Sequence, residues 1–83
     1  MNVALRRLLD VRGVEPKHRF ETIMTAYEAL APSETLELVV DHDPLCMYYT
    51  IRATRGEDSF TFAYLEEGPE VWRVEVTPSA PKS

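Results

Sequence analysis

The chain has 83 residues, of which 45% are hydrophobic and 28% are charged, and its formal net charge is −5. This length and composition indicate one globular domain. The negative charge argues against a nucleic-acid-binding protein, and the apolar runs are too short to span a membrane. A single cysteine excludes an internal disulfide, and arginines within the first apolar stretch are not typical of a secretory signal. We therefore expect a cytoplasmic protein that binds neither nucleic acid nor membrane.

Positive charge is concentrated at the start of the chain. Residues 1–20 contain five Arg and Lys side chains against two acids, a local charge of +3, so the remaining residues sum to −8. One interpretation is a strand with basic residues beside a solvated acidic surface. The alternative is a positive patch that receives an anion or an acidic partner. The five cations are Arg6, Arg7, Arg12, Lys17 and Arg19.

The first predicted elements are a strand and an amphipathic helix. In residues 5–11, one face of the pattern carries Leu5, Leu9 and Val11. The other face carries Arg6, Leu8 and Asp10, which predicts a strand ended by Gly13. Pro16 suits the first turn of the helix that follows. Apolar residues then recur at helical spacing and predict a helix over residues 17–30 with one buried face. That face consists of Phe20, Ile23, Met24, Tyr27 and Leu30.

The segment after the second strand has two interpretations. Residues 34–40 alternate between apolar and polar side chains, which predicts a strand that runs into "DHDP". Asp43 followed by Pro44 is typical of a helix start. The tyrosines, threonines and isoleucine of residues 45–54 are more typical of a strand. The residues alone leave this segment open.

The last part of the chain predicts an antiparallel hairpin. Residues 59–65 and 71–77 both alternate, and turn residues separate them. Trp72 is expected to lie in the core beneath this hairpin. We expect a single domain over residues 1–77, followed by a flexible tail at 78–83.

The order of the first elements predicts where a ligand would bind. A strand, a crossover helix and a second strand in one sheet are parallel, so both strands end at the same edge. Open α/β sheets bind ligands at this edge. The segments "EPKHR" at residues 15–19 and "DHDP" at residues 41–44 are therefore expected to be neighbours. We expect a protein partner or a small ligand to bind there. The helix starts favour an anion, whereas the acidic side chains favour a cation, so the charge of the ligand is left open.

Seven residues near this edge are candidates for ligand binding: Arg12, Glu15, Lys17, His18, Asp41, His42 and Cys46. His42 with Asp41 is the candidate metal pair, and a metal would need a further ligand such as His18 or Cys46. Cys46 would lie at a helix start, where a thiolate is stabilised, which permits persulfide, metal or redox chemistry. The interpretation that we favour is a small packed residue. The sequence has no Gly-rich phosphate loop, CxxC pair or nucleophile elbow, so we assign no catalytic residue and do not favour an enzyme.

Four stretches of the sequence resemble a known family: "LDVRGVEP", "APSETLELVVDHDP", "MYYTIRA" and "YLEEGPEVWRV". They are similar to domain of unknown function 2249, an uncharacterised branch of the TusA/SirA-like superfamily of small bacterial domains. The resemblance covers most of the chain. It implies an α+β fold, a two-layer α/β sandwich of order β-α-β-α-β-β with a four-stranded mixed sheet and two helices on one face. It also makes residues 45–54 the second helix.

The resemblance implies the scaffold of a sulfur carrier without its cysteine. TusA proteins carry a persulfide on the cysteine of a Cys-Pro-x-Pro motif, where the first helix begins. Here "GVEPKHR" occupies that region, and Pro16 stands where the cysteine would be. The branch often has a histidine near this helix start; His18 lies close by, and Phe20 occupies the expected place.

Two functions are consistent with these observations. The first is a non-enzymatic binding or carrier-type module that lacks the persulfide cysteine and needs no cofactor. The alternative is a metal- or redox-linked accessory domain that uses a transition metal at His42 with Asp41, and with His18 or Cys46. Members of the branch are found joined to hemerythrin-like metal domains, which keeps this alternative open. The sequence does not indicate the oligomeric state.

Overall fold

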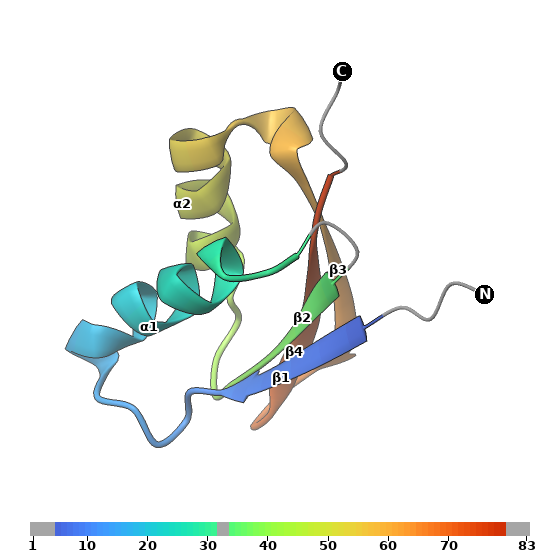
Figure 1. Ribbon diagram of the computed structural model, residues 1–83. Helices are drawn as coiled ribbons and strands as arrows, with labels where there is room; N and C mark the ends of the chain where they lie inside the picture. Colours follow the sequence, from blue (N-terminus) through green and yellow to red (C-terminus); the bar gives the residue numbers. More distant parts are fainter. Residues whose placement is uncertain (1–4, 32–33, 80–83) are drawn as a thin grey trace.

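The two helices lie on one face of a four-stranded sheet and leave the other face bare (Figure 1). The computed structural model describes residues 5–31 and 34–79, and the element order is β1-α1-β2-α2-β3-β4 with a short 3-10 turn, η1 (Glu57–Ser59), before β3. The α+β sandwich expected from the sequence is thus confirmed. Residues 80–83 of the expected tail lie outside the described residues. In the part of the chain that is described, no helix is long and apolar enough to cross a membrane.

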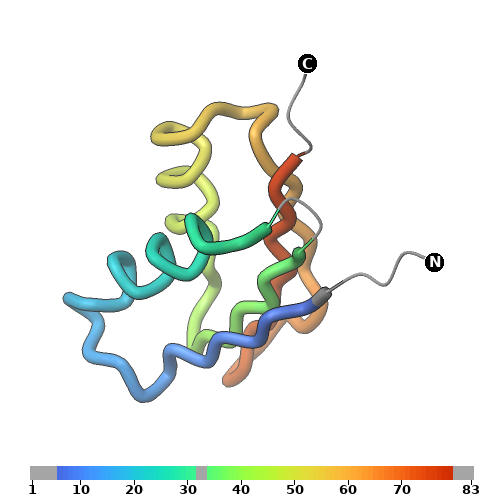
Figure 2. Tube along the Cα trace, in the orientation of Figure 1, coloured from blue at the N-terminus to red at the C-terminus, as the bar shows by residue number. Residues whose placement is uncertain are grey.

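The sheet has the order β1-β2-β4-β3. β1 is parallel to β2, while β4 is antiparallel to both β2 and β3. The parallel pair confirms that β1 and β2 end at one edge, and Figure 2 shows their carboxyl ends meeting there. The strands are β1 (Leu5–Asp10), β2 (Glu34–Val40), β3 (Phe60–Glu67) and β4 (Trp72–Pro78).

Local sequence explains where both helices begin. α1 (Pro16–Glu28) begins at the proline, as predicted, and ends before Leu30. The segment that the residues alone left open, 45–54, is helical and forms most of α2 (Leu45–Arg55). Its start follows Asp43, whose Oδ1 accepts the backbone N–H of Leu45 at 3.1 Å, which is the predicted helix-start interaction. Burial of Ile51 against the sheet provides packing that outweighs the strand preference of the neighbouring tyrosines and threonines.

The core lies between the sheet and the two helices. Alternation in β2 and β4 directs one side chain in two toward the helices, as the sequence predicts. From the helices, α1 contributes Ile23 and Met24, and α2 contributes Ile51. The completely buried residues are Val11, Leu36, Leu38, Ile51, Val74 and Val76. Phe20, predicted for the buried face of α1, is instead 42% exposed.

Trp72 lies at the margin of the core. Its ring is half-buried and packs against the buried cluster, so the expectation of a core position holds only in part. The indole Nε1 donates to the carbonyl of Pro69 at 3.3 Å. Gly68 has a φ of 58°, and a Cβ there would come within 2.7 Å of the indole, so only glycine fits beneath this ring.

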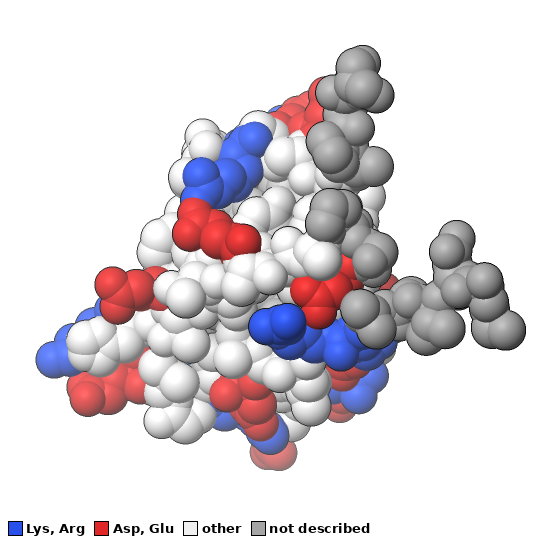
Figure 3. Space-filling view, viewed as in Figure 1, with Lys and Arg blue, Asp and Glu red and all other residues white. Residues whose placement is uncertain are grey.

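Ion pairs neutralise the basic start of the chain. Acidic and basic atoms lie in contact on the face shown in Figure 3. All five cations of residues 1–20 are within salt-bridge distance of an acid, which supports the interpretation as a mixed surface over that of a positive patch. The pairs are Arg6 with Glu37 and Glu75, Arg7 with Glu34, Arg12 with Asp10, Lys17 with Glu15, and Arg19 with Asp41.

Candidate functional site

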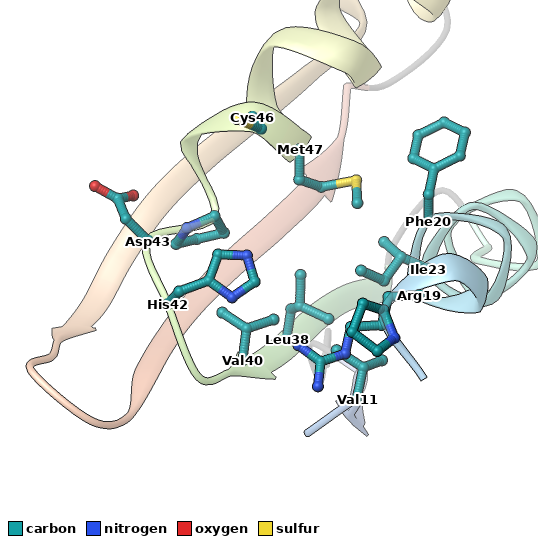
Figure 4. A pocket seen from close by; sticks show the side chains of 12 residues that line it. Val11, Arg19, Phe20, Ile23, Leu38, Val40, His42, Asp43, Cys46 and Met47 are labelled. Atoms are coloured by element: carbon teal, nitrogen blue, oxygen red, sulfur yellow. The ribbon is translucent and has the colours of Figure 1, made fainter. Parts of the chain in front are cut away.

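A cavity of about 210 Å³ opens between the first turns of α1 and α2, above the carboxyl ends of β1 and β2. We call it the carboxyl-edge pocket (Figure 4). It lies where the parallel β1–β2 pair predicts a ligand site. Its lining residues are Val11, Pro16, Arg19, Phe20, Ile23, Leu38, Val40, His42, Asp43, Pro44, Cys46 and Met47.

The surface of the pocket is mainly apolar. Leu38 and Val40 of β2 point toward the helices because they occupy alternate positions on the buried face of that strand. Across the opening, Met47 of α2 points toward Phe20 and Ile23 of α1 (Figure 4). The exposure of Phe20 follows from this position, because the ring borders the opening instead of the closed core.

Arg19 organises the rim. Its guanidinium binds Asp41 through two contacts, Nη1 to Oδ1 at 2.9 Å and Nη2 to Oδ2 at 3.2 Å. Its Nε donates to the carbonyl of Val14 at 2.7 Å, and Nη2 donates to the carbonyl of Arg12 at 3.1 Å. The side chain is only 14% exposed. Arg19 therefore ties the β1–α1 loop to the end of β2, and its donors are used within the protein.

Asp41 also fixes the orientation of His42. The Nδ1 of His42 lies 2.9 Å from Asp41 Oδ1. Hydrogen bonds from Arg19, then from His42, lower the pKa of Asp41 to about 2, so its carboxylate is ionised at neutral pH and only accepts. Nδ1 must therefore carry the hydrogen. In the neutral imidazole, Nε2 is then an acceptor with no protein partner among the described residues.

Asp43 lines the pocket but its carboxylate points away from the cavity (Figure 4). Besides the N–H of Leu45, its Oδ1 accepts the hydroxyl of Tyr64 at 2.6 Å. This hydrogen bond, with burial, raises the pKa of Tyr64 to about 12. Asp43 thus joins α2 to β3 and has a structural role.

Comparison with protein families provides a family but no activity. The model of the family Uncharacterized conserved protein (DUF2249) matches residues 8–78, which is most of the chain. The chain belongs to the DUF2249 family. Comparison with curated proteins and with solved structures gave no significant match.

In this DUF2249 domain, the seven candidate residues fall into two groups. His42 and Cys46 line the pocket. Asp41 does not line it but binds Arg19, which does. Cys46 is exposed, and no hydrogen bond joins it to His42 among the described residues. The remaining candidates do not line the pocket: Arg12, Glu15, Lys17 and His18.

The second group is exposed, and three of its four members, Arg12, Glu15 and Lys17, are paired locally. Arg12 binds Asp10 through both Nε and Nη2, the latter at 2.6 Å, which lowers the pKa of Asp10 to about 2. Lys17 lies 3.9 Å from Glu15. His18 is exposed on α1. Arg12 and Glu15 precede α1, and the helix directs Lys17 and His18 away from the cavity, because the α1 positions that face it include Arg19, Phe20 and Ile23.

The structure does not bring together the ligand set that the metal hypothesis requires. Within residues 5–31 and 34–79, no three His, Cys, Asp or Glu side chains are placed to hold one ion. Asp41, the candidate partner of His42, is occupied by Arg19. The DUF2249 domain therefore has an apolar pocket with a polar rim at the place where the sequence suggested a metal.

Proposed function

We propose that this domain is a non-enzymatic binding module that takes an apolar group of a small ligand or of a partner protein into the carboxyl-edge pocket. The observation that carries this proposal is the mainly apolar lining between two helix starts, at the edge where the β1–β2 pair ends. Pockets that bind small molecules are concave and apolar, with few polar groups that fix orientation.

The volume of the pocket limits the size of the occupant. A dry cavity of roughly 150 Å³ holds a benzene molecule, so about 210 Å³ accommodates one substituted aromatic ring or a branched aliphatic group. Such a group would cover the exposed part of Phe20 and contact Ile23 and Met47. Removal of this apolar surface from water stabilises the complex by about 25 cal/mol per Å².

The rim supports a neutral ligand with a hydrogen-bond donor. Arg19 and Asp41 neutralise each other, so neither provides a free charge to attract an ion. In the neutral imidazole, His42 Nε2 is an acceptor without a partner among the described residues. A ring that carries a hydroxyl or amide N–H combines these requirements, and tyrosine and tryptophan side chains of a partner protein belong to this class.

Descent from the TusA/SirA-like superfamily is part of this proposal. The element order, the mixed sheet and the placement of both helices on one face support it. Pro16 opens α1, where the carriers have their cysteine, and it lines the same pocket. A proline cannot hold a persulfide, so the module would keep the binding edge of a carrier without the carried sulfur.

Sulfur loading distinguishes a binding module from a carrier. After incubation with a persulfide donor, intact-mass measurement should show little stable addition of sulfur, because only Cys46 could hold it. Stoichiometric addition that disappears in Cys46→Ser would instead make the domain a carrier that uses a different helix start.

A titration with p-cresol tests the pocket itself. Followed by backbone amide shifts, it should perturb residues 19–23 and 40–47. Cys46→Trp should block the response by covering the opening, whereas Thr54→Trp, on the exposed end of the same helix, should not. Phosphate and Zn²⁺ provide ionic controls. If p-cresol leaves residues 19–23 and 40–47 unchanged while either ion shifts them, the proposal is wrong.

A further inference from the structure

The two edge strands of the sheet differ in how they are protected. β3 has a register shift between Tyr64 and Glu66 and ends in two glutamates. Bulges and charges of this kind discourage pairing with another strand. β1 pairs with β2 in unbroken register over its whole length and exposes Leu8 to 65%. Of the two edges, β1 is therefore the one suited to accept another strand.

The backbone of β1 has hydrogen-bonding groups directed outward. The N–H of Val11 donates to the carbonyl of Val39 in β2 at 3.1 Å. Because the direction of backbone groups alternates along a strand, those of Arg6, Leu8 and Asp10 face away from β2. No described strand lies on that side. Three residues thus present three donors and three acceptors to a partner strand.

These three residues are complementary to themselves. If two β1 strands pair antiparallel with Leu8 opposite Leu8, Arg6 of each copy lies opposite Asp10 of the other. The Leu8–Leu8 pair and the two Arg6–Asp10 pairs are all hydrogen-bonded pairs in that register, because all three residues have outward-facing backbone groups. Opposite charges and apolar residues at directly opposed positions each stabilise a strand pair. Arg6 and Asp10 would add this contact to the ion pairs that they form with Glu37, Glu75 and Arg12 in their own chain. We propose that a second copy of this chain pairs with β1 in this register, forming a two-fold dimer with a continuous eight-stranded sheet.

Symmetry limits the assembly to two chains. The contact is isologous, since each copy uses the same surface, and the dimer removes both β1 edges. The edges that remain are the two β3 strands, which the register shift and the glutamates protect. A contact of one short strand is small, so the equilibrium should be concentration-dependent. The carboxyl-edge pocket lies on the helix-covered face, while Leu8 lies on the bare face, so both sites can be occupied together.

Analytical ultracentrifugation over about a hundredfold range of concentration tests the proposal. The weight-average mass should rise from 9.5 kDa toward twice that value. Leu8→Lys and Leu8→Glu should each remain monomeric, since each places like charges opposite one another. An equimolar mixture of the two variants should restore the dimer, because lysine then faces glutamate.

The control is Leu65→Lys on β3, a leucine that is 41% exposed at the opposite edge and should leave the dimer unchanged. Circular dichroism would verify that each variant is folded. The proposal is wrong if the native chain stays monomeric at the highest concentration, if Leu8→Lys dimerises as the native chain does, or if the mixture of charged variants stays monomeric. A dimer abolished by Leu65→Lys would assign the contact to β3 instead.

Discussion

The two faces of the sheet use charged side chains differently. On the bare face, Arg6 binds Glu37 and Glu75, and these side chains cover three adjacent strands. On the helix-covered face, apolar side chains form a continuous layer, and Arg19 with Asp41 closes it at one edge. Because the charged groups of the bare face are paired with one another, that face offers few unpaired charges to a ligand. The gap between the helix starts leaves apolar atoms of the pocket uncovered, which is why ligand binding, as distinct from pairing of the β1 edge, is assigned to that side.

Truncating a leucine on each face should produce the largest difference in the free energy of unfolding between the two faces. Leu38 is completely buried beneath the pocket, so Leu38→Ala should lower the free energy of unfolding by about 2–5 kcal/mol. Leu8 is 65% exposed on the bare face, and Leu8→Ala should change it by less than about 0.5 kcal/mol. Urea unfolding of dilute protein measures both. Equal losses would mean that the faces are assigned wrongly.

Replacing an arginine on each face should produce a smaller difference in the free energy of unfolding, again with the larger loss on the helix-covered face. Arg19→Met leaves the carbonyls of Arg12 and Val14 and the carboxylate of Asp41 without their donor, and should cost about 1–3 kcal/mol. Arg6 is 48% exposed, so Arg6→Met should cost less. Chemical unfolding compares the two variants. A larger loss for Arg6→Met would contradict the view that Arg19 joins the β1–α1 loop to β2.

The smallest expected effect is the response to acid. The pKa of Asp41 falls from 3.8 to about 2 in the folded protein because of its hydrogen bonds with Arg19 and His42. A lowered pKa contributes stability above the unfolded value, and this contribution is lost as the pH falls from about 4 to about 2. Asp41→Asn should therefore flatten the pH dependence of stability in that range. Asp10, whose pKa falls to about 2 beside Arg12, provides the comparison at β1. An unchanged slope in Asp41→Asn would show that the Arg19 contact does not persist in solution.

Local patterns predicted most of the fold. Alternation located all four strands, and helical spacing located α1, because burial of one face imposes these periods on the sequence. The segment of α2 could not be assigned from its residues, since tyrosine, threonine and isoleucine also suit strands, and only the resemblance identified it as a helix. Trp72 was placed on the correct face, but its half-burial depends on how the turn at Gly68 packs beneath the ring.

The location of the candidate site was predictable, whereas its composition was not. Parallel strands brought residues 15–19 and 41–44 to one edge, as the topology requires. The Arg19–Asp41 pair was missed because it joins residues 22 positions apart, and its formation depends on the phase of α1. The same phase directs His18 outward and Phe20 toward the pocket. A helix shows which residues share a face, but the orientation of that face relative to a loop depends on tertiary packing.

The most direct test of the central claim is to locate p-cresol bound to the native domain by intermolecular nuclear Overhauser effects. The account predicts contacts from the p-cresol methyl and ring protons to the side chains of Ile23, Leu38 and Met47. These contacts should disappear in Cys46→Trp and persist in Thr54→Trp. Contacts to the bare face at Leu8, with Ile23, Leu38 and Met47 silent, would contradict the claim that the carboxyl-edge pocket is the binding site.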